Sequence, residues 1–82
     1  MAALPTLTLY MKPECHLCEE TLAVLERLRR RYPHELRTVD ISADPTLLER
    51  YRHRIPVLAV GGSEYSTPLT PSIVQQALAR TR

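Results

Sequence analysis

Three stretches of the chain have the hydrophobic pattern of β-strands. Polar and apolar residues alternate over residues 6–10 and again over residues 36–41, which predicts strands that bury one face. Residues 55–60 are continuously apolar and have a proline at the second position, near the start of the strand, where proline is tolerated. The two glycines at 61–62 then predict a hairpin turn into a short fourth strand near residues 64–66.

Elsewhere the apolar residues recur every three or four positions, which predicts helices. The first helix starts at Cys15 and ends at Pro33, and its apolar face is Cys18, Leu22, Leu25, Leu28 and Tyr32. Two further helices start at residues 44–45 and 70–71, where Asp or Thr caps the helix and proline takes its first position. Their apolar faces are Leu47, Leu48 and Tyr51, and Ile73, Val74, Ala77 and Leu78.

The resulting order of elements is β-α-β-α-β-β-α, an α/β pattern. Its β-α-β opening predicts a right-handed crossover between two parallel strands, and the hairpin adds an antiparallel edge. Helices on both faces of a small mixed sheet bury the apolar surfaces of such a chain. With 82 residues there is room for one domain, residues 1–82, with an ordered core at about residues 6–80.

Charge and hydropathy narrow the range of functions. The net charge of +2 is too small to indicate a nucleic-acid partner, and the arginines within residues 27–31 suit either a binding patch or a solvated helix end that complements the helix dipole. The longest apolar run has six residues, so no membrane span is expected. Residues 1–5 lack the features of a signal peptide. We therefore expect a cytoplasmic monomer.

Cys15 and Cys18 are the only cysteines, and they stand where the first strand has ended and the first helix begins. The free N–H groups and the partial positive charge of a helix N-terminus stabilise a thiolate. In the cytoplasm such a pair is catalytic or metal-binding rather than a structural bridge. A zinc site needs two more ligands, and His16, His34 and His53 do not have a suitable spacing. We therefore expect thiol–disulfide chemistry and no metal or cofactor.

These features together resemble a known family. The C-H-L-C motif of residues 15–18, the Val-Asp-Ile strand at 39–41 and the Arg-Ile-Pro-Val-Leu stretch at 54–58 are similar to small bacterial glutaredoxin-like proteins. The resemblance covers residues 6 to about 79. It implies a thioredoxin-like fold of the glutaredoxin type, with a four-stranded mixed sheet and helices on both faces.

The resemblance also implies roles for individual residues. Cys15 matches the nucleophilic cysteine and Cys18 the resolving cysteine. Pro56 matches a proline whose preceding peptide bond is cis and which lies against the dithiol. Ile55 matches the residue whose backbone pairs with the bound thiol substrate, and Lys12 matches a lysine that helps to hold glutathione.

The sequence departs from the glutaredoxin pattern at three places. His16-Leu17 replaces Pro-Tyr between the cysteines, and Arg54-Ile55-Pro56 replaces Thr-Val-Pro. Glutaredoxins also carry a second Gly-Gly, followed by a small residue and an aspartate that binds the glutamyl end of glutathione. Residues 66–70 stand in that place and contain no acidic residue. Glutathione as reductant therefore rests only on the other parts of the resemblance.

The expected chemistry is an exchange in which Cys15 attacks a substrate disulfide and Cys18 displaces the product. The helix terminus, with His16 and Lys12 nearby, is expected to lower the pKa of Cys15 below the free value of about 8.5. His16 either tunes the thiolate or is an exposed side chain without influence. Arg52 and Arg54 either receive a carboxylate of the substrate or of an acidic partner, or are solvated.

The sequence thus predicts a thiol–disulfide oxidoreductase that acts on a protein or a low-molecular-weight disulfide. Its reductant would be linked to thioredoxin or glutathione. The alternative is a thioredoxin-fold binding module that recognises a partner through the face around Pro56 without redox turnover.

Overall fold

The computed structural model describes residues 4–66 and 68–80, and its centre is a four-stranded sheet in the order β2-β1-β3-β4. Strand β1 (Thr6–Met11) pairs in parallel with β2 (Glu35–Asp40) on one side and antiparallel with β3 (Val57–Val60) on the other. Strand β4 (Ser63–Ser66) pairs antiparallel with β3 and forms the edge. The mixed sheet predicted from the order of elements is confirmed.

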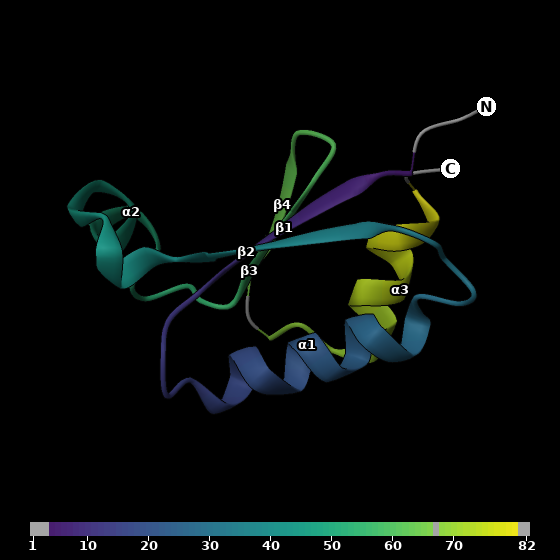
Figure 1. The fold of residues 1–82 in the computed structure, drawn as a ribbon, viewed down its shortest axis with the longest axis horizontal. Coiled ribbons are helices and arrows are strands. Elements are labelled where there is room, and N and C mark those ends of the chain that lie inside the picture. The colour runs from purple at the N-terminus through teal and green to yellow at the C-terminus, as the bar shows by residue number, and fades with distance from the viewer. Residues whose placement is uncertain (1–3, 67, 81–82) are drawn as a thin grey trace.

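One face of the sheet is covered by two helices, α1 (His16–Leu28) and α3 (Pro71–Ala79), which lie on the same side in Figure 1. The alternation in β1 directs Leu7 and Leu9 to this face, where they are fully buried. Leu58 and Val60 of β3 join them, together with buried residues of both helices: Val24, Leu25, Val74, Ala77 and Leu78. This is the larger of the two hydrophobic clusters, and it holds α1 in place.

Among the described residues, α2 (Pro45–Tyr51) covers the other face at one end, at the left of Figure 1. Tyr10 of β1 and Val57 of β3 point to this face and pack with Ile41 and Tyr51. Helices therefore lie on both faces, as predicted. Because α2 has seven residues, the rest of this face keeps partly exposed side chains such as Thr8 and Ala59.

Capping hydrogen bonds confirm the two predicted helix starts, and the backbone angles of the glycines confirm the hairpin turn. The Asp44 side chain accepts hydrogen bonds from the N–H groups of Thr46 and Leu47 at 2.9 and 3.3 Å. The Thr70 hydroxyl accepts from the N–H of Ile73 at 3.2 Å. Gly61 and Gly62 have φ values of 52° and 87°, a left-handed conformation that glycine adopts without the Cβ penalty of other residues.

Helix α1 ends five residues before Pro33, earlier than predicted. The N–H of Arg29 bonds to the carbonyl of Glu26, an i to i−3 contact of 3.3 Å that tightens the last turn. Proline disfavours helical geometry in the residue before it, and the chain must turn here to enter β2. The prediction that Tyr32 continues the helix was wrong, although its ring still packs against the larger cluster.

Two strand boundaries also differ from the prediction. Ile41 leaves the sheet and begins a 3-10 turn, Ile41–Ala43, capped by the Asp40 carboxylate at 2.9 Å from the N–H of Ser42. Strand β3 begins at Val57 rather than Ile55, because the N–H of Ile55 donates to the carbonyl of Tyr51 at 3.1 Å and Pro56 has no N–H to give. Residues 55 and 56 thus belong to the loop before the strand.

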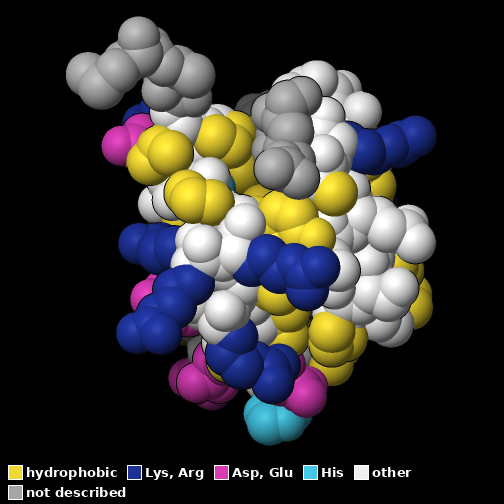
Figure 2. Space-filling view, turned by 90° about the vertical axis from the view of Figure 1, so that its right-hand side faces the viewer, with side chains coloured by type: hydrophobic (Ala, Val, Ile, Leu, Met, Phe, Trp, Pro, Cys, Tyr) yellow, Lys and Arg dark blue, Asp and Glu magenta, His cyan; other side chains and the backbone are white. Residues whose placement is uncertain are grey.

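The end of the molecule at which α1 stops is basic. Figure 2 looks at this end and shows Lys and Arg side chains projecting around a strip of hydrophobic side chains. Arg29 pairs with Glu26 at 3.8 Å, and the guanidinium of Arg31 lies 5.6 Å from the centre of the Tyr32 ring.

In the described part of the chain no helix is long and apolar enough to cross a membrane.

Candidate active site

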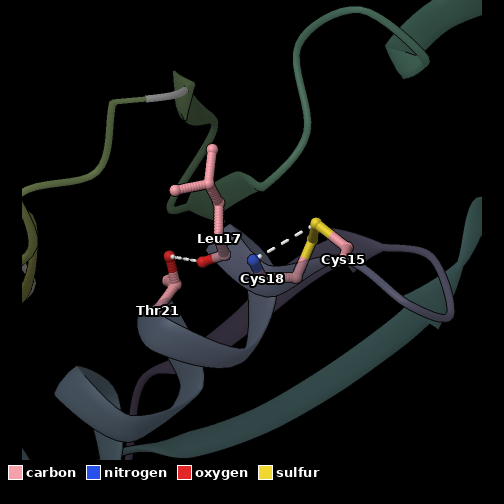
Figure 3. The surroundings of a disulfide bond; sticks show 4 residues. All are labelled: Cys15, Leu17, Cys18 and Thr21. Carbon is pink, nitrogen blue, oxygen red and sulfur yellow. Dashed lines mark hydrogen bonds between the residues drawn. A yellow bond between two sulfur atoms is a disulfide. The ribbon is translucent and has the colours of Figure 1, made fainter.

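Cys15 and Cys18 form a disulfide at the N-terminus of α1 (Figure 3), with their Cα atoms 5.2 Å apart. Cys15 is the N-cap of the helix, and its Sγ accepts a hydrogen bond from the N–H of Cys18 at 3.2 Å. The side chain of Cys18 is fully buried, whereas Cys15 is half-buried. The two sulfurs therefore differ in access, and only Cys15 is open to a partner molecule.

The chain reaches this geometry through a short loop after β1. Glu14 has a φ of 60°, a left-handed conformation that costs a residue other than glycine about 1–2 kcal/mol. This residue turns the chain so that Cys15 can cap the helix. One turn further on, the buried hydroxyl of Thr21 donates to the carbonyl of Leu17 at 2.9 Å, which leaves this polar group satisfied beneath the site.

A mostly apolar groove of about 450 Å³ lies between α1 and the segment that enters α3, and neither cysteine is among the residues that line it. Leu17, which lies between the two cysteines and is 52% exposed, forms one wall. The buried Pro56 lies at the same groove, and the peptide bond before it is cis. The remaining described lining comes from α1 and from the segment that enters α3: Glu20, Thr21, Ala23, Val24, Arg27, Pro68, Leu69, Thr70 and Pro71.

The other predicted site residues are distributed around this centre. Lys12 is exposed in the loop before Cys15. The His16 side chain is 86% exposed, and its Nε2 lies 3.6 Å from the carboxylate of Glu20, its neighbour one turn along α1. Ile55 is half-buried in the smaller hydrophobic cluster. Its N–H is used by the carbonyl of Tyr51.

The Arg54 side chain is exposed, and its guanidinium also contacts two protein groups. Its guanidinium lies 3.4 Å from Oε1 of Glu64 and 5.6 Å from the centre of the Tyr51 ring. The Tyr51 hydroxyl donates to Oε2 of the same Glu64 carboxylate at 2.5 Å. This hydrogen bond and the burial of the ring raise the pKa of Tyr51 to about 12, because ionisation would place a second negative charge beside Glu64.

Sequence reasoning missed the contact between Tyr51 and Glu64. The 3.6-residue period placed Tyr51 on the buried face of its helix, and it is 2% exposed. Nothing in the sequence indicated that its hydroxyl would meet Glu64, because that residue lies on a strand formed thirteen positions later. The exposed Leu17 was likewise assigned no role from the sequence, although it lines the groove.

Of the three histidines, only His16 is next to the cysteines in the sequence. Across residues 4–66 and 68–80, no three His, Cys, Asp or Glu side chains lie together in a way that would hold a metal ion. His34 is buried far along the chain, where its Nδ1 lies 2.6 Å from the carbonyl of Tyr32. Its Nε2 is buried without a hydrogen-bond partner.

A four-stranded mixed sheet with a C-x-x-C disulfide at the start of α1 defines a protein of the thioredoxin-like fold. The chain belongs to the family described as Glutaredoxin-like domain (DUF836), whose sequence model matches residues 6–81. This agrees with the resemblance carried by the C-H-L-C motif and the Arg-Ile-Pro-Val-Leu stretch.

Solved structures support the same assignment. Protein XcR50 from X. campestris is 30% identical over 93% of this chain and 99% of its own, with a TM-score of 0.80. Protein Ne2328 from Nitrosomonas europaea is 28% identical over 93% of each chain, with a TM-score of 0.78. Thioredoxin O2 from Arabidopsis thaliana, in its oxidized state, is 19% identical over 94% of this chain and 74% of its own, with a TM-score of 0.73. This last likeness concerns the fold alone.

Proposed function

We propose that this protein is a thiol–disulfide oxidoreductase that reduces disulfides of other proteins by a dithiol mechanism. The observation that carries the proposal is the unequal access of the two bonded sulfurs, since Cys15 is half-buried at the helix cap and Cys18 is fully buried. Exchange needs one accessible thiolate that attacks and a second thiol that resolves the mixed disulfide. The arrangement provides both roles.

The reaction starts from the reduced dithiol. The Cys15 thiolate attacks one sulfur of the substrate disulfide, forming a mixed disulfide and releasing the other sulfur as a thiolate that takes up a proton. Cys18 then loses its proton and attacks Sγ of Cys15, which forms the Cys15–Cys18 disulfide and releases the second substrate thiol. Two electrons have passed to the substrate, and an external thiol reductant must return two electrons to the protein in a reducing compartment such as the cytoplasm.

The groove beside the disulfide favours a protein substrate over glutathione. Its described walls are largely Leu, Val, Ala and Pro side chains, and Glu20 and Arg27 are the only charged residues among them. Residues 66–70 lack the acidic side chain that would pair with the amino group of glutathione. An apolar side chain next to the substrate cysteine would bury its surface against Leu17 and Leu69, at about 25 cal/mol per Å².

The test compares the wild type with Cys15→Ser and Cys18→Ser in the reduction of insulin and of hydroxyethyl disulfide, each coupled to dithiothreitol and, separately, to glutathione. We expect turnover of insulin by the wild type, none by Cys15→Ser, and a trapped mixed disulfide on Cys15 in Cys18→Ser. The rate of alkylation of Cys15 by iodoacetamide against pH measures its thiolate directly. A wild type inactive on both substrates would refute the proposal and favour the binding module.

A further inference from the structure

The loop that carries Pro56 to the groove is short, and its position sets the shape of one side of the groove. This segment, residues 52–56, is called here the proline loop; it joins the end of α2 to the start of β3. Pro56 lies at the groove with Leu17. A shift of the proline loop would therefore change the shape of the proposed substrate site without touching either sulfur.

Tyr51 is the last residue of α2 and holds the backbone of the proline loop. Its carbonyl accepts two hydrogen bonds, from the N–H of Arg54 at 2.8 Å and from the N–H of Ile55 at 3.1 Å. One residue, Tyr51, therefore holds the turn that leads from the helix into the loop. The N–H of Ile55, the residue directly before Pro56, is thereby engaged within the protein.

Two contacts hold the side chain of Tyr51, and a third contact links its partner Glu64 to the proline loop. Its ring stacks on Tyr10 of β1, with the ring centres 4.4 Å apart and the planes inclined by 22°. Its hydroxyl donates to Oε2 of Glu64 on β4. Oε1 of the same carboxylate lies 3.4 Å from the guanidinium of Arg54, which belongs to the proline loop itself.

Packing alone does not account for this arrangement. A phenylalanine at position 51 would fill the same space and stack on Tyr10, so burial does not require the hydroxyl. The hydroxyl brings Tyr51 to a carboxylate that also engages the proline loop, and a hydrogen bond to a charged acceptor is stronger and more directional than one between neutral groups. One carboxylate thus ties the end of α2 and the proline loop to the edge strand of the sheet.

We propose that Tyr51, Glu64 and Arg54 form a clamp that positions the proline loop for substrate binding. The proposal rests on the proposed function, and the three are positioning residues, because their hydrogen bonds and ring contacts involve neither Cys15 nor Cys18. Loosening the clamp weakens substrate binding and leaves the thiol chemistry unchanged.

The main test compares Tyr51→Phe with Tyr65→Phe. Tyr65 is a matched control because it is another tyrosine with a hydrogen-bonded hydroxyl, next to Glu64 on β4. That hydroxyl accepts from Arg80 at 3.4 Å and does not contact the proline loop. For insulin reduction we expect Tyr51→Phe to raise KM about fivefold with kcat nearly unchanged, which is the pattern of lost uniform binding. Tyr65→Phe should keep the wild-type KM.

Two further measurements separate positioning from general destabilisation. The pH profile of Cys15 alkylation should coincide in the wild type and in Tyr51→Phe, because the clamp does not contact the sulfurs. Glu64→Gln should raise KM at least as much as Tyr51→Phe does, because it also weakens the contact with Arg54, and the double variant should be no worse than Glu64→Gln alone. Equal KM values in Tyr51→Phe and the wild type, or additive effects in the double variant, would overturn the clamp.

Amide hydrogen exchange tests the clamp without turnover. In the oxidised protein, Tyr51→Phe should speed exchange at the N–H groups of Arg54 and Ile55 about tenfold, with Tyr65→Phe unchanged, since local opening governs exchange there. If the wild type reduces no disulfide, the proposed function fails, and exchange alone then decides the clamp. Unchanged exchange at both amides would refute it.

Discussion

Removal of the Tyr51 hydroxyl should change how the stability of the fold depends on pH in alkaline solution. In the folded protein the pKa of Tyr51 is raised from 10.0 to about 12, first by the hydrogen bond to Glu64 and then by burial. Below pH 10 the hydroxyl is protonated in both the folded and the unfolded chain, so its stabilising contribution is fully present. Between pH 10 and 12 the unfolded chain loses this proton while the folded chain keeps it, so the free energy of unfolding falls as pH rises.

The size of the effect follows from the two pKa values. The difference of about two pKa units between the folded and unfolded chain, at about 1.36 kcal/mol per pKa unit, corresponds to roughly 3 kcal/mol once the pH has passed the folded value. This agrees with the roughly 1.5–3 kcal/mol of a hydrogen bond to a charged group. Integration of the proton linkage from about pH 9 to about pH 11 gives a loss of roughly 1 kcal/mol.

The assay is urea unfolding of the oxidised protein at about pH 9 and about pH 11, for the wild type and Tyr51→Phe. We expect the wild type to lose roughly 1 kcal/mol more than Tyr51→Phe across this interval, and Tyr65→Phe, which keeps Tyr51, to follow the wild type. The tyrosinate absorbance of the wild type minus that of Tyr51→Phe gives the titration of Tyr51 itself. A midpoint near pH 10 in that difference would refute the reasoning. Equal losses of stability in the wild type and in Tyr51→Phe between the two pH values would do the same.

Three other substitutions test the core, the helix start and the groove. Leu58→Ala removes a fully buried side chain and should lower the free energy of unfolding in urea by about 2–5 kcal/mol; a loss below about 1 kcal/mol would contradict its central place in the larger cluster. Asp44→Ala deletes the cap of α2 and should lower the free energy of unfolding by about 1 kcal/mol, whereas Asp44→Asn should keep most of this stability. Leu17→Ser should change stability by less than about 0.5 kcal/mol, because the side chain is half-exposed. It should raise KM for insulin but not for hydroxyethyl disulfide, and equal effects on both substrates would argue against the groove as the protein-binding site.

Local signals predicted most of the elements because each depends on neighbouring residues. Alternation in β1 and the caps at Asp44 and Thr70 are satisfied by contacts within a few positions along the chain. The boundaries were wrong where a distant or competing partner intervened. Ile41 lies outside its predicted strand, where it packs with Tyr51 of α2. Ile55 lies outside its strand because its N–H donates to the carbonyl of Tyr51.

The candidate site was predicted in part for the same reason. Cys15 and Cys18 are three positions apart, so the start of a helix suffices to bring them together and to make one sulfur more accessible than the other. The groove joins Leu17, Pro56 and Leu69, which are separated by up to about fifty positions, and only the packing of α1, β3 and α3 brings them to one surface.

The sequence by itself determined the order of elements, the capped helices, the glycine turn and a thiol pair at the start of a helix, because short-range backbone geometry and hydrophobic periodicity govern all four. The tertiary structure decided which side chains surround the disulfide. Parallel pairing of β1 with β2 and antiparallel pairing of β3 and β4 carry Glu64 to Tyr51 and Pro56 to the groove. Such contacts depend on strand register and on the closure of long loops, which no local pattern in the chain encodes.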